Sequence, residues 1–395
     1  MTMIDVSHLP VLDVHAHPFL HGEAVSADQL ADLVAFSARQ SYLTEGGIPD
    51  TAESRAEMQR MFRNTVYHRR MVRDLAGFFG CEPTLEAVIA ARTARIVAVG
   101  YTPYVGELFG AVQLRTIVFD MGFPQPPVPL AGVQAQLPVE IVPIYRIEPL
   151  IAELLKSDCG WSEFQRRYEE AIVSALTSGG YRGLKSIIAY RTGLDVSPLS
   201  RTADQGMQAL DAIRRGLGGG SMKKLRDHLL CRALELAIAH DVPMQIHTGM
   251  GDYEVNLPLC RPSYLMDLLR FPVYRACRVL LVHGGYPYTR EAGYMAGVLP
   301  RVYLDLSEGI PFAGGAARSI VAEALEMTPL HKICYGSDGY SVPEINFTSA
   351  LAGKQAVARA LDDLVADGLL GAADAQQAAG LILAGNGREL YQLDR

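Results

Sequence analysis

The feature that most constrains the fold is a regular alternation of short apolar runs with helical patterns along most of the chain. Apolar runs separated by helical segments are typical of a parallel sheet that is buried on both faces. Eight such runs predict an α/β fold, namely a closed (β/α)8 TIM barrel. The predicted strands occupy residues 11–18, 116–120, 139–146, 183–191, 243–247, 279–283, 302–306 and 332–338, and the clearest helical patterns lie at 162–178, 221–240, 262–270, 289–298 and 315–327.

A helix-rich stretch separates the first predicted strand from the second. Residues 54–79 show amphipathic helical spacing among many arginines, and residues 83–99 open with a proline and continue as a helix. We therefore expect one barrel domain over residues 1–395, with a helical insertion at residues 19–110. Because active sites of this fold lie where strands end, we expect the insertion to form a cap or an oligomer interface, and the protein to be a homo-oligomer. A peripheral insertion without such a role is the alternative.

Composition excludes several functional classes. The chain has 395 residues, of which 49% are hydrophobic and 20% charged, and no apolar run is long enough to cross a bilayer. Its net charge of −7 argues against a nucleic-acid partner, which needs a concentrated basic face. The first residues lack the basic segment and long apolar core of a secretory signal, so we expect a cytoplasmic protein. The six cysteines are scattered and form no Cys-x-x-Cys motif, which is typical of a reducing compartment.

Two histidines stand at the end of the first predicted strand. In Val-Leu-Asp-Val-His15-Ala-His17-Pro the histidines are two positions apart, so both side chains project to the same side of a strand. Two neutral imidazoles side by side can share one cation, and zinc and other first-row divalent metals suit such nitrogen ligands. Alone, this short pattern is weak evidence, because a strand-end histidine can also be held by ordinary hydrogen bonds.

Later predicted strands end in residues that could complete such a metal site. Arg191, His247, His283 and Asp338 close the predicted strands 4, 5, 6 and 8. In a (β/α)8 barrel these ends meet at one rim, which is where catalytic residues lie. Three nitrogen ligands and a carboxylate around a divalent ion leave room for water, whose pKa the ion lowers. Asp338 is then a natural proton acceptor, which can return the proton to a leaving nitrogen.

The set His15-Ala-His17, His247, His283 and Asp338 resembles the amidohydrolase superfamily over essentially the whole chain. The segments 183–194, 245–252, 283–288, 335–338 and 386–391 are similar to one subgroup, the amidohydrolase module of plant nodulin-like and fungal developmental proteins. There the module is fused to a glutamine-synthetase-like domain, whereas in bacteria it occurs alone. We expect this chain to be the free-standing form.

The resemblance implies a divalent metal site with one or two ions, Zn²⁺ foremost and Mn²⁺ or Fe²⁺ as alternatives. Its ligands would be His15, His17, His247 and Asp338. His283 would either bind a second metal or polarise the substrate carbonyl, so Asp338 and His283 are the catalytic candidates. Lys185 is open: in related binuclear enzymes a carbamylated lysine bridges the metals, but this lysine falls near the predicted start of its strand and could be structural.

Several residues are candidates for substrate binding. Arg191 offers a guanidinium that can hold a carboxylate in a bidentate manner, although an ion pair with a loop residue such as Asp195 would also explain it. The glycine-rich segment 214–221 lacks the Gly-Lys-Ser/Thr ending of a phosphate loop, so we interpret it as a mobile loop over the barrel mouth. The residues expected to contact substrate or rim the pocket are Arg191, Lys185, Tyr286 and Asp252, with Glu254, Tyr288 and Glu308 beside them.

These observations lead to one main hypothesis and two rivals. The main hypothesis is a metal-dependent hydrolase in which metal-bound hydroxide cleaves a C–N (amide) bond of a small carboxylated substrate. A γ-glutamyl-type amide is implied only by the subgroup's relatives. The first rival keeps the site but makes the protein a decarboxylase of an unsaturated or aromatic acid. The second is a non-catalytic barrel, against which the intact set of ligands argues.

Overall fold

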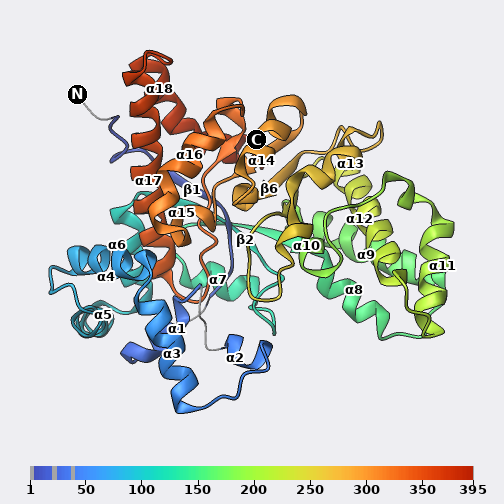
Figure 1. Ribbon diagram of the computed structural model, residues 1–395, viewed down its shortest axis with the longest axis horizontal. Coiled ribbons are helices and arrows are strands. Elements are labelled where there is room, and N and C mark those ends of the chain that lie inside the picture. Colours follow the sequence, from blue (N-terminus) through green and yellow to red (C-terminus); the bar gives the residue numbers. More distant parts are fainter. Residues whose placement is uncertain (1–3, 20–24, 37–40, 395) are drawn as a thin grey trace.

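Eight parallel strands form the centre of the computed structural model, which describes residues 4–19, 25–36 and 41–394 (Figure 1). Each strand pairs with the next in chain order, from first to last. This confirms the predicted α/β barrel with parallel strands. The strands are β1 (Val11–Ala16), β2 (Leu114–Asp120), β3 (Glu140–Arg146), β4 (Leu184–Ser186), β5 (Met244–His247), β6 (Val279–Val282), β7 (Val302–Asp305) and β8 (Ile333–Cys334).

Backbone hydrogen bonds join the last strand to the first. Val14 N donates to Tyr335 O at 3.0 Å, and Asp338 N donates to His15 O at 2.8 Å. The chain after β8 therefore runs beside β1 and brings the last part of the sequence next to the first. Closure of this kind leaves no sheet edge unpaired and places all strand ends around one rim.

The strands form because their residues are apolar on both faces. All four residues of β6 are buried, as are all six of β1. Inside the barrel, small and branched side chains such as Val14, Val118 and Leu280 pack together in one cluster. Tyr391 closes this cluster from the chain's last turns, where its hydroxyl accepts a hydrogen bond from Gln245 Nε2 at 2.6 Å. The barrel interior is therefore filled, and the open space lies at the other end of the strands.

Helices connect the strands around the outside of the barrel (Figure 1). Each crossover returns the chain to the start of the next parallel strand, as this fold requires. In the described part of the chain no helix combines the length and the apolar composition needed to cross a bilayer. The helices after β2 are α7 (Leu130–Gln136), α8 (Ile147–Leu155), α9 (Trp161–Thr177), α10 (Ile188–Arg191), α11 (Ala203–Arg214), α12 (Ser221–Ala239), α13 (Met266–Arg270), α14 (Thr289–Val298), α15 (Gly309–Phe312), α16 (Ala317–Leu325), α17 (Pro343–Ala366), α18 (Ala372–Gly380) and α19 (Asn386–Leu390).

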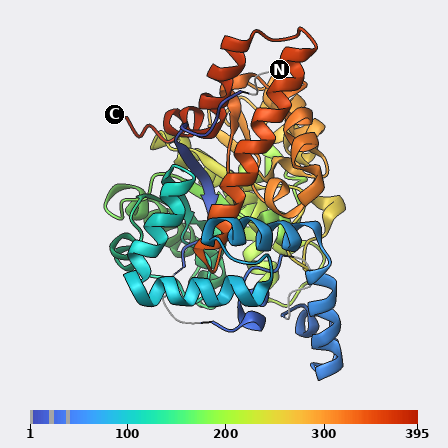
Figure 2. The ribbon, with the colours of Figure 1, turned by 90° about the vertical axis from the view of Figure 1, so that its left-hand side faces the viewer.

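Six further helices lie between β1 and β2, within the segment 19–110 discussed above, of which residues 20–24 and 37–40 lie outside the described part. In Figure 2 the longer ones lie together at one end of the molecule, next to the red α17. They are α1 (Ala27–Leu33), α2 (Ser41–Glu45), α3 (Ala52–Arg63), α4 (Val66–Phe79), α5 (Leu85–Val99) and α6 (Tyr101–Ala111).

The helical pattern at residues 54–79 covers two helices rather than one. Helix α3 ends at Arg63, with Asn64 as its C-cap, and Thr65 is the N-cap of α4, where the threonine hydroxyl accepts a hydrogen bond from His68 N at 3.1 Å. A threonine that binds the free N–H groups of a new helix favours a break at that position. The spacing of apolar residues continues across the break, so the pattern alone did not reveal it.

Strand 4 is shorter than the sequence predicted. Strand β4 ends at Ser186, and Arg191 lies in the one-turn helix α10. Lys185 is the middle residue of this three-residue strand, so it lies next to the start of the strand, as expected, and also next to its end. The apolar residues after Ser186 mimic a longer strand because they are buried in the short helix. Lys185 thus reaches the rim, where active-site residues are found.

A buried ion pair ties the helices of this segment to the end of the barrel that follows β8. The Arg92 guanidinium of α5 contacts Glu344 in the first turn of α17, and Tyr104 of α6 donates to the same carboxylate oxygen at 2.5 Å. Arg92 and Glu344 are 1% and 0% exposed. Because α17 begins five residues after Asp338, this pair fixes the chain immediately beyond the barrel rim.

We predict that Arg92→Met lowers the free energy of unfolding by about 3–5 kcal/mol, because it leaves the Glu344 carboxylate buried without its cation. Arg95→Met is the matched control on the same helix, since Arg95 pairs with Glu107 in a largely exposed position. Denaturant unfolding of both variants measures the difference. Equal loss of stability in the two variants would contradict the argument.

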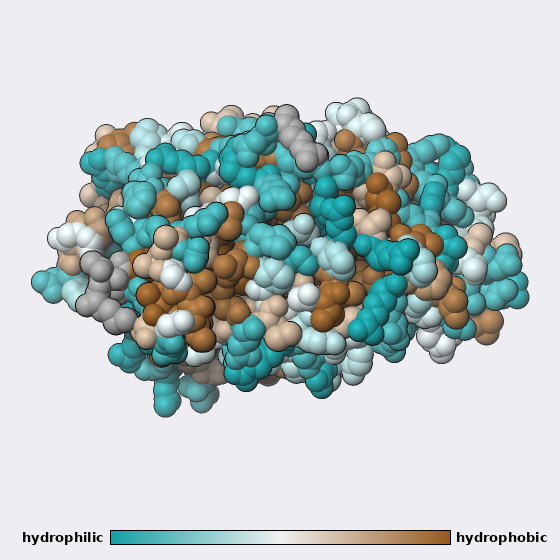
Figure 3. Space-filling view, turned by 90° about the horizontal axis from the view of Figure 1, so that it is seen from above, coloured by the Kyte–Doolittle hydropathy of each residue, from teal (hydrophilic) through white to brown (hydrophobic). Residues whose placement is uncertain are grey.

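Apolar side chains also gather on the surface. Figure 3 shows an apolar patch within a mainly hydrophilic face. Large exposed apolar residues of the molecule include Tyr294, Val298 and Met327. No partner chain identifies what would cover such residues, so the homo-oligomer expected from the sequence stays a prediction.

Candidate metal centre

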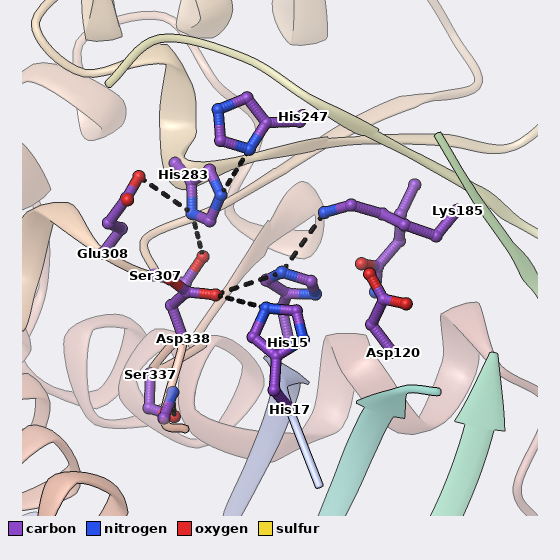
Figure 4. A network of polar contacts seen from close by, with 12 residues as sticks. His15, His17, Asp120, Lys185, His247, His283, Ser307, Glu308, Ser337 and Asp338 are labelled. Carbon is purple, nitrogen blue, oxygen red and sulfur yellow. Dashed lines mark hydrogen bonds and ion pairs between the residues drawn. The ribbon is translucent and has the colours of Figure 1, made fainter. Parts of the chain in front are cut away.

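His15, His17 and Asp338 meet at one point of the barrel rim (Figure 4). The Nε2 atoms of His15 and His17 lie 3.2 and 3.3 Å from the same atom, Oδ1 of Asp338. His15 is almost completely buried, and His17 and Asp338 keep only 11% and 12% of their side-chain surface exposed. Two ring nitrogens and a carboxylate oxygen therefore converge on a common centre that is largely shielded from solvent.

The local backbone explains this convergence. His15 belongs to β1 and His17 follows it, so the strand period turns both rings to the same side. His17 N donates to Gly339 O at 2.7 Å, and Asp338 N donates to His15 O at 2.8 Å. These two bonds hold the chain after β8 against the end of β1. The two histidines and the aspartate are thus positioned by main-chain contacts rather than by their side chains alone.

Four further side chains form a hydrogen-bonded chain beside this centre. Ser307 Oγ donates to Asp305 Oδ1 at 2.6 Å, which leaves the serine oxygen to accept from His283 Nδ1 at 2.9 Å. His283 Nε2 then carries a lone pair and accepts from His247 Nδ1, also at 2.9 Å. His247 Nε2 is consequently unprotonated, and it is buried without a hydrogen-bond partner. The chain sets both imidazoles in defined tautomers.

Three residues of the site adopt a backbone conformation that is unusual for side-chain-bearing residues. His283, Glu308 and Asp338 have φ angles of 71°, 57° and 55°. They follow β6, β7 and β8, where the chain turns sharply away from the barrel. The left-handed region costs free energy for residues other than glycine, and such residues gather at functional sites. The sharp turns aim all three side chains across the rim.

Burial controls the protonation of the histidines. It lowers the pKa of His15 and His247 well below the usual range, and the positive charge of Lys185 adds to the shift. Burial also lowers the pKa of His283, with the neighbouring His247 as the next contributor. All three rings are therefore neutral near pH 7. Neutral imidazole is the form that binds metal ions.

Charged side chains surround the histidines. Lys185 Nζ lies 3.2 Å from His15 Nε2, and burial lowers its pKa to about 8. Arg146 donates to Asp120 Oδ2 from Nε at 2.9 Å and from Nη2 at 2.6 Å. Burial opposes ionisation of Asp120, but the charge of Arg146 and its hydrogen bonds, together with the charge of Lys185 and the neighbouring His17, outweigh burial, so the pKa of Asp120 is lowered. The ends of β2, β3 and β4 thus supply one anion and two cations.

The atoms of this site fit a divalent cation. Four ligands placed tetrahedrally about 2.0–2.1 Å from a zinc ion lie roughly 3.3 Å from one another, close to the spacing of His15, His17 and Asp338. Ligand atoms of three groups lie within 4.8 Å of one another: His15, His283 and Asp338; His15, His17 and Asp120; and His247, His283 and Glu308. Buried atoms of these groups that have no hydrogen-bond partner among the described residues are His15 Nδ1, His17 Nδ1, His247 Nε2, Glu308 Oε2 and Asp338 Oδ1.

A cavity of about 150 Å³ opens above the histidines. Arg191 and Asp252 line it, as do Lys185 and Glu308. Asp252 accepts a hydrogen bond from the Tyr42 hydroxyl at 3.0 Å, and its backbone N–H donates to the Tyr190 hydroxyl at 2.9 Å. The cavity therefore brings together the histidines, Asp338 and three of the four predicted substrate-binding residues.

Other predicted rim residues lie elsewhere. Tyr286 is not among the residues that line this cavity; its backbone oxygen accepts from Met250 N at 2.7 Å, and its role in substrate binding stays a prediction. Tyr288 lies under the Arg261 guanidinium. Arg191 pairs with Glu254 at 3.1 Å rather than with Asp195. The segment 214–221 connects α11 and α12 without lining the cavity.

Sequence reasoning gave no role to several residues that shape the site. These are polar residues at strand ends, in the same kind of position as the histidines. The signal was present, since Asp120 ends β2, Arg146 ends β3 and Asp305 ends β7. A carboxylate at the end of a buried strand is costly unless it has a partner at the rim, so Asp120 and Asp305 indicate such partners from the sequence alone.

Comparison with known proteins agrees with this architecture. A sequence model described as amidohydrolase matches residues 170–393. The protein fluG of Emericella nidulans is 35% identical over 248 residues, which cover 59% of this chain but 28% of fluG, so the chain spans about a quarter of that relative.

Solved structures share the fold over the whole chain. The crystal structure of a protein named as a metal-dependent hydrolase from Lactobacillus casei is 25% identical and has a TM-score of 0.83, covering 100% of this chain and 99% of that one. The glucuronate isomerase of Caulobacter crescentus is 17% identical with a TM-score of 0.66, over 99% of this chain and 92% of that one. The second similarity shows the fold alone.

We predict that the purified protein binds a divalent ion and that a chelator lowers its melting temperature. An ion present at 100 times its dissociation constant stabilises the folded state by about 2.7 kcal/mol. His247→Ala and Asp338→Ala should lose this response, while His331→Ala, at an exposed position outside the site, should keep it. Elemental analysis and thermal unfolding with and without Zn²⁺ or Mn²⁺ measure the effect. Absence of bound metal and of any thermal response would contradict the assignment.

Proposed function

Because the chain belongs to the amidohydrolase family, we propose that it is a metal-dependent enzyme that hydrolyses a C–N (amide) bond in a small carboxylated compound. The observation that carries the proposal is the convergence of His15 and His17 on Asp338 Oδ1 in a cavity large enough to admit the reacting group of a substrate. Imidazole nitrogens and a carboxylate oxygen that converge on one point are the ligand atoms that a divalent cation such as zinc binds.

His15, His17, His247 and Asp338 are the proposed ligands, with Zn²⁺ as the first candidate ion. His283, Glu308 and Asp120 extend this set, because each completes a group of ligand atoms within 4.8 Å. The extended set supports a second ion beside the first. A divalent cation bound here would supply Lewis acidity, which makes water acidic and polarises a carbonyl oxygen.

Asp338 is the proposed proton carrier. Its Oδ1 faces the two histidines, which leaves Oδ2 to accept a proton from an attacking water. The water oxygen forms a bond to the amide carbon while this proton passes to Oδ2. Oδ2 of Asp338 then returns the proton to the leaving nitrogen as the C–N bond breaks. The products are a carboxylic acid and an amine. One carboxylate thus serves both halves of the reaction.

The hydrogen bonds of His283 set its tautomer and thereby limit its role in the reaction. With its Nδ1 proton directed at Ser307, its Nε2 has a lone pair and cannot donate to a carbonyl oxygen. This tautomer argues against polarisation of the substrate by His283, and a ligand role would require the ion to replace the hydrogen bond from His247 Nδ1. Ser307 and Asp305 act through His283 as positioning residues.

Lys185 and Arg191 supply positive charge along the cavity. Lys185 Nζ lies 3.2 Å from His15 Nε2. It could therefore donate a hydrogen bond to a substrate oxygen that lies beside this ring. Arg191 is partly exposed and pairs with Glu254, an exposed side chain that a substrate carboxylate could replace. Asp252 stands opposite, where it can accept a hydrogen bond from a polar substrate group.

We predict that Asp338→Asn reduces kcat by about 10²–10⁴-fold without unfolding the protein, because the amide cannot take up the proton. The assay screens a panel of carboxylated amides with the metal-loaded protein and measures released amine or ammonia. Asp367→Asn, on an exposed helix end, is the matched control and should retain full activity.

The same assay separates the rival functions. Release of carbon dioxide from an unsaturated or aromatic acid, without release of amine from any amide, would identify a decarboxylase. Near-normal amide hydrolysis by Asp338→Asn would show that the proposed proton carrier is wrong. A protein that holds no metal after purification would favour a non-catalytic barrel.

A further inference from the structure

A larger chamber adjoins the cavity above the histidines. It has a volume of about 870 Å³, against about 150 Å³ for the cavity itself. Phe123, Arg146, Ile187 and Arg191 line both spaces, so the two lie side by side and share part of their walls. Pockets that enclose a whole small-molecule ligand are typically about 300–1,000 Å³, which the cavity alone does not reach. We call the larger space the side chamber.

Arg226 of α12 lines the side chamber, and none of the contacts described above involves it. No hydrogen bond or ion pair joins its guanidinium to any residue that the structure describes, although the side chain is half-buried. Burial lowers the pKa of Arg226, the charge of Glu148 opposes this shift, and the charge of Arg191 adds to it. A guanidinium stays protonated at neutral pH, so a partly desolvated charge is kept here without a partner.

The other charged groups of the side chamber either form hydrogen bonds with neighbouring side chains or are exposed to solvent. Arg146 makes two hydrogen bonds to Asp120. Glu148, the acid that acts on Arg226, accepts from Ser186 Oγ at 2.7 Å through Oε1, its Oε2 is buried without a hydrogen-bond partner among the described residues, and burial raises its pKa. Lys156 and Glu153 are exposed at the opening. No ion pair joins Arg226 to Glu148 among the described residues, so the donors of the Arg226 guanidinium are available to an anion in the chamber.

We propose that the side chamber binds a carboxylate of the substrate remote from the bond that is cleaved, with Arg191 and Arg226 as its ligands. This inference rests on the proposed function, because it places the scissile group at the histidines. Arg191 lines both spaces and Arg226 lines only the side chamber, so the pair marks a path away from the reacting atoms. Two guanidiniums can hold one carboxylate with charge-assisted hydrogen bonds.

The walls of the side chamber define the rest of the substrate. Apolar and aromatic side chains line it, among them Met121, Tyr145, Leu150 and Tyr181. A carboxylate held among such residues must be attached to an apolar or aromatic body that fills the space between it and the scissile group. The substrate class is therefore an elongated amphipathic acid joined through an amide, rather than a compact and uniformly polar one.

Calorimetric titration of the protein as purified tests this inference with two probes of the same shape. 3-Phenylpropionate carries the carboxylate, and 3-phenylpropanamide is its neutral counterpart. We expect the wild-type protein to prefer the carboxylate, and Arg226→Gln to weaken carboxylate binding about ten- to one-hundred-fold while leaving binding of the neutral probe unchanged. Arg226→Lys, which keeps the charge, should restore part of the loss.

Arg215→Gln is the matched control, since Arg215 is an exposed arginine at the end of α11 outside the side chamber. It should bind both probes as the wild type does. Equal affinity of the wild type for the two probes, or unchanged carboxylate binding in a folded Arg226→Gln protein, would overturn the proposal. A carboxylate bound only to a metal at the histidines would give the second of these results.

The titration needs no turnover, so it separates this inference from the proposed function. A protein that loses carboxylate binding with Arg226→Gln but cleaves no amide would support the side chamber and reject amide hydrolysis. Where an amide substrate is found, Arg226→Gln should raise KM for the carboxylated form with kcat retained. If the protein hydrolyses an amide and Arg226→Gln leaves KM unchanged, the proposed carboxylate site in the side chamber is wrong, while the proposed hydrolysis stands.

Discussion

The contact between the first and last parts of the barrel is the constraint on which the site depends. Asp13 stands inside β1, and its buried carboxylate accepts from Ser337 N at 2.8 Å, from Asn346 Nδ2 at 3.1 Å and from the Ser337 hydroxyl. Burial raises the pKa of Asp13 to about 7, although each of these donors favours the ionised form. A carboxylate held this tightly links the histidine strand to the chain that carries Asp338.

The space at this contact is small enough to restrict the sequence. A Cβ added at Gly339 would lie 2.5 Å from Asn346 Nδ2, closer than any side chain tolerates. The absence of a side chain there lets the segment after β8 approach Asn346 while its carbonyl accepts from His17 N. Shape and hydrogen bonding therefore act together: close packing brings the backbone near, and the bonds fix which atoms of the two histidines and Asp338 face one another.

The sequence was sufficient for the barrel and for the histidines because both depend on local patterns. An apolar run followed by a polar residue reports a strand and its end at once, and in a parallel barrel every such end lies at one rim. His15, His17, His247 and His283 could be brought together on that rule alone. The same rule was misleading for Arg191, since the apolar residues before it are buried by a helical turn rather than by a strand.

The pairings beyond this rule could not be predicted, because they join residues that no local period connects. Asp120 and Arg146 end neighbouring strands, and Arg226 faces the same region from a helix that carries no motif. Each buried charge near the histidines is costly without a partner, and Asp120, Lys185 and Glu308 reduce that cost only in part through one another. Two kinds of group remain without full compensation. A cation would compensate the lone-pair atoms of the histidines and Asp338, and an anion would compensate the guanidinium of Arg226. Apolar side chains at both places would avoid the cost of these buried polar groups, so the presence of polar groups there supports ligands at both.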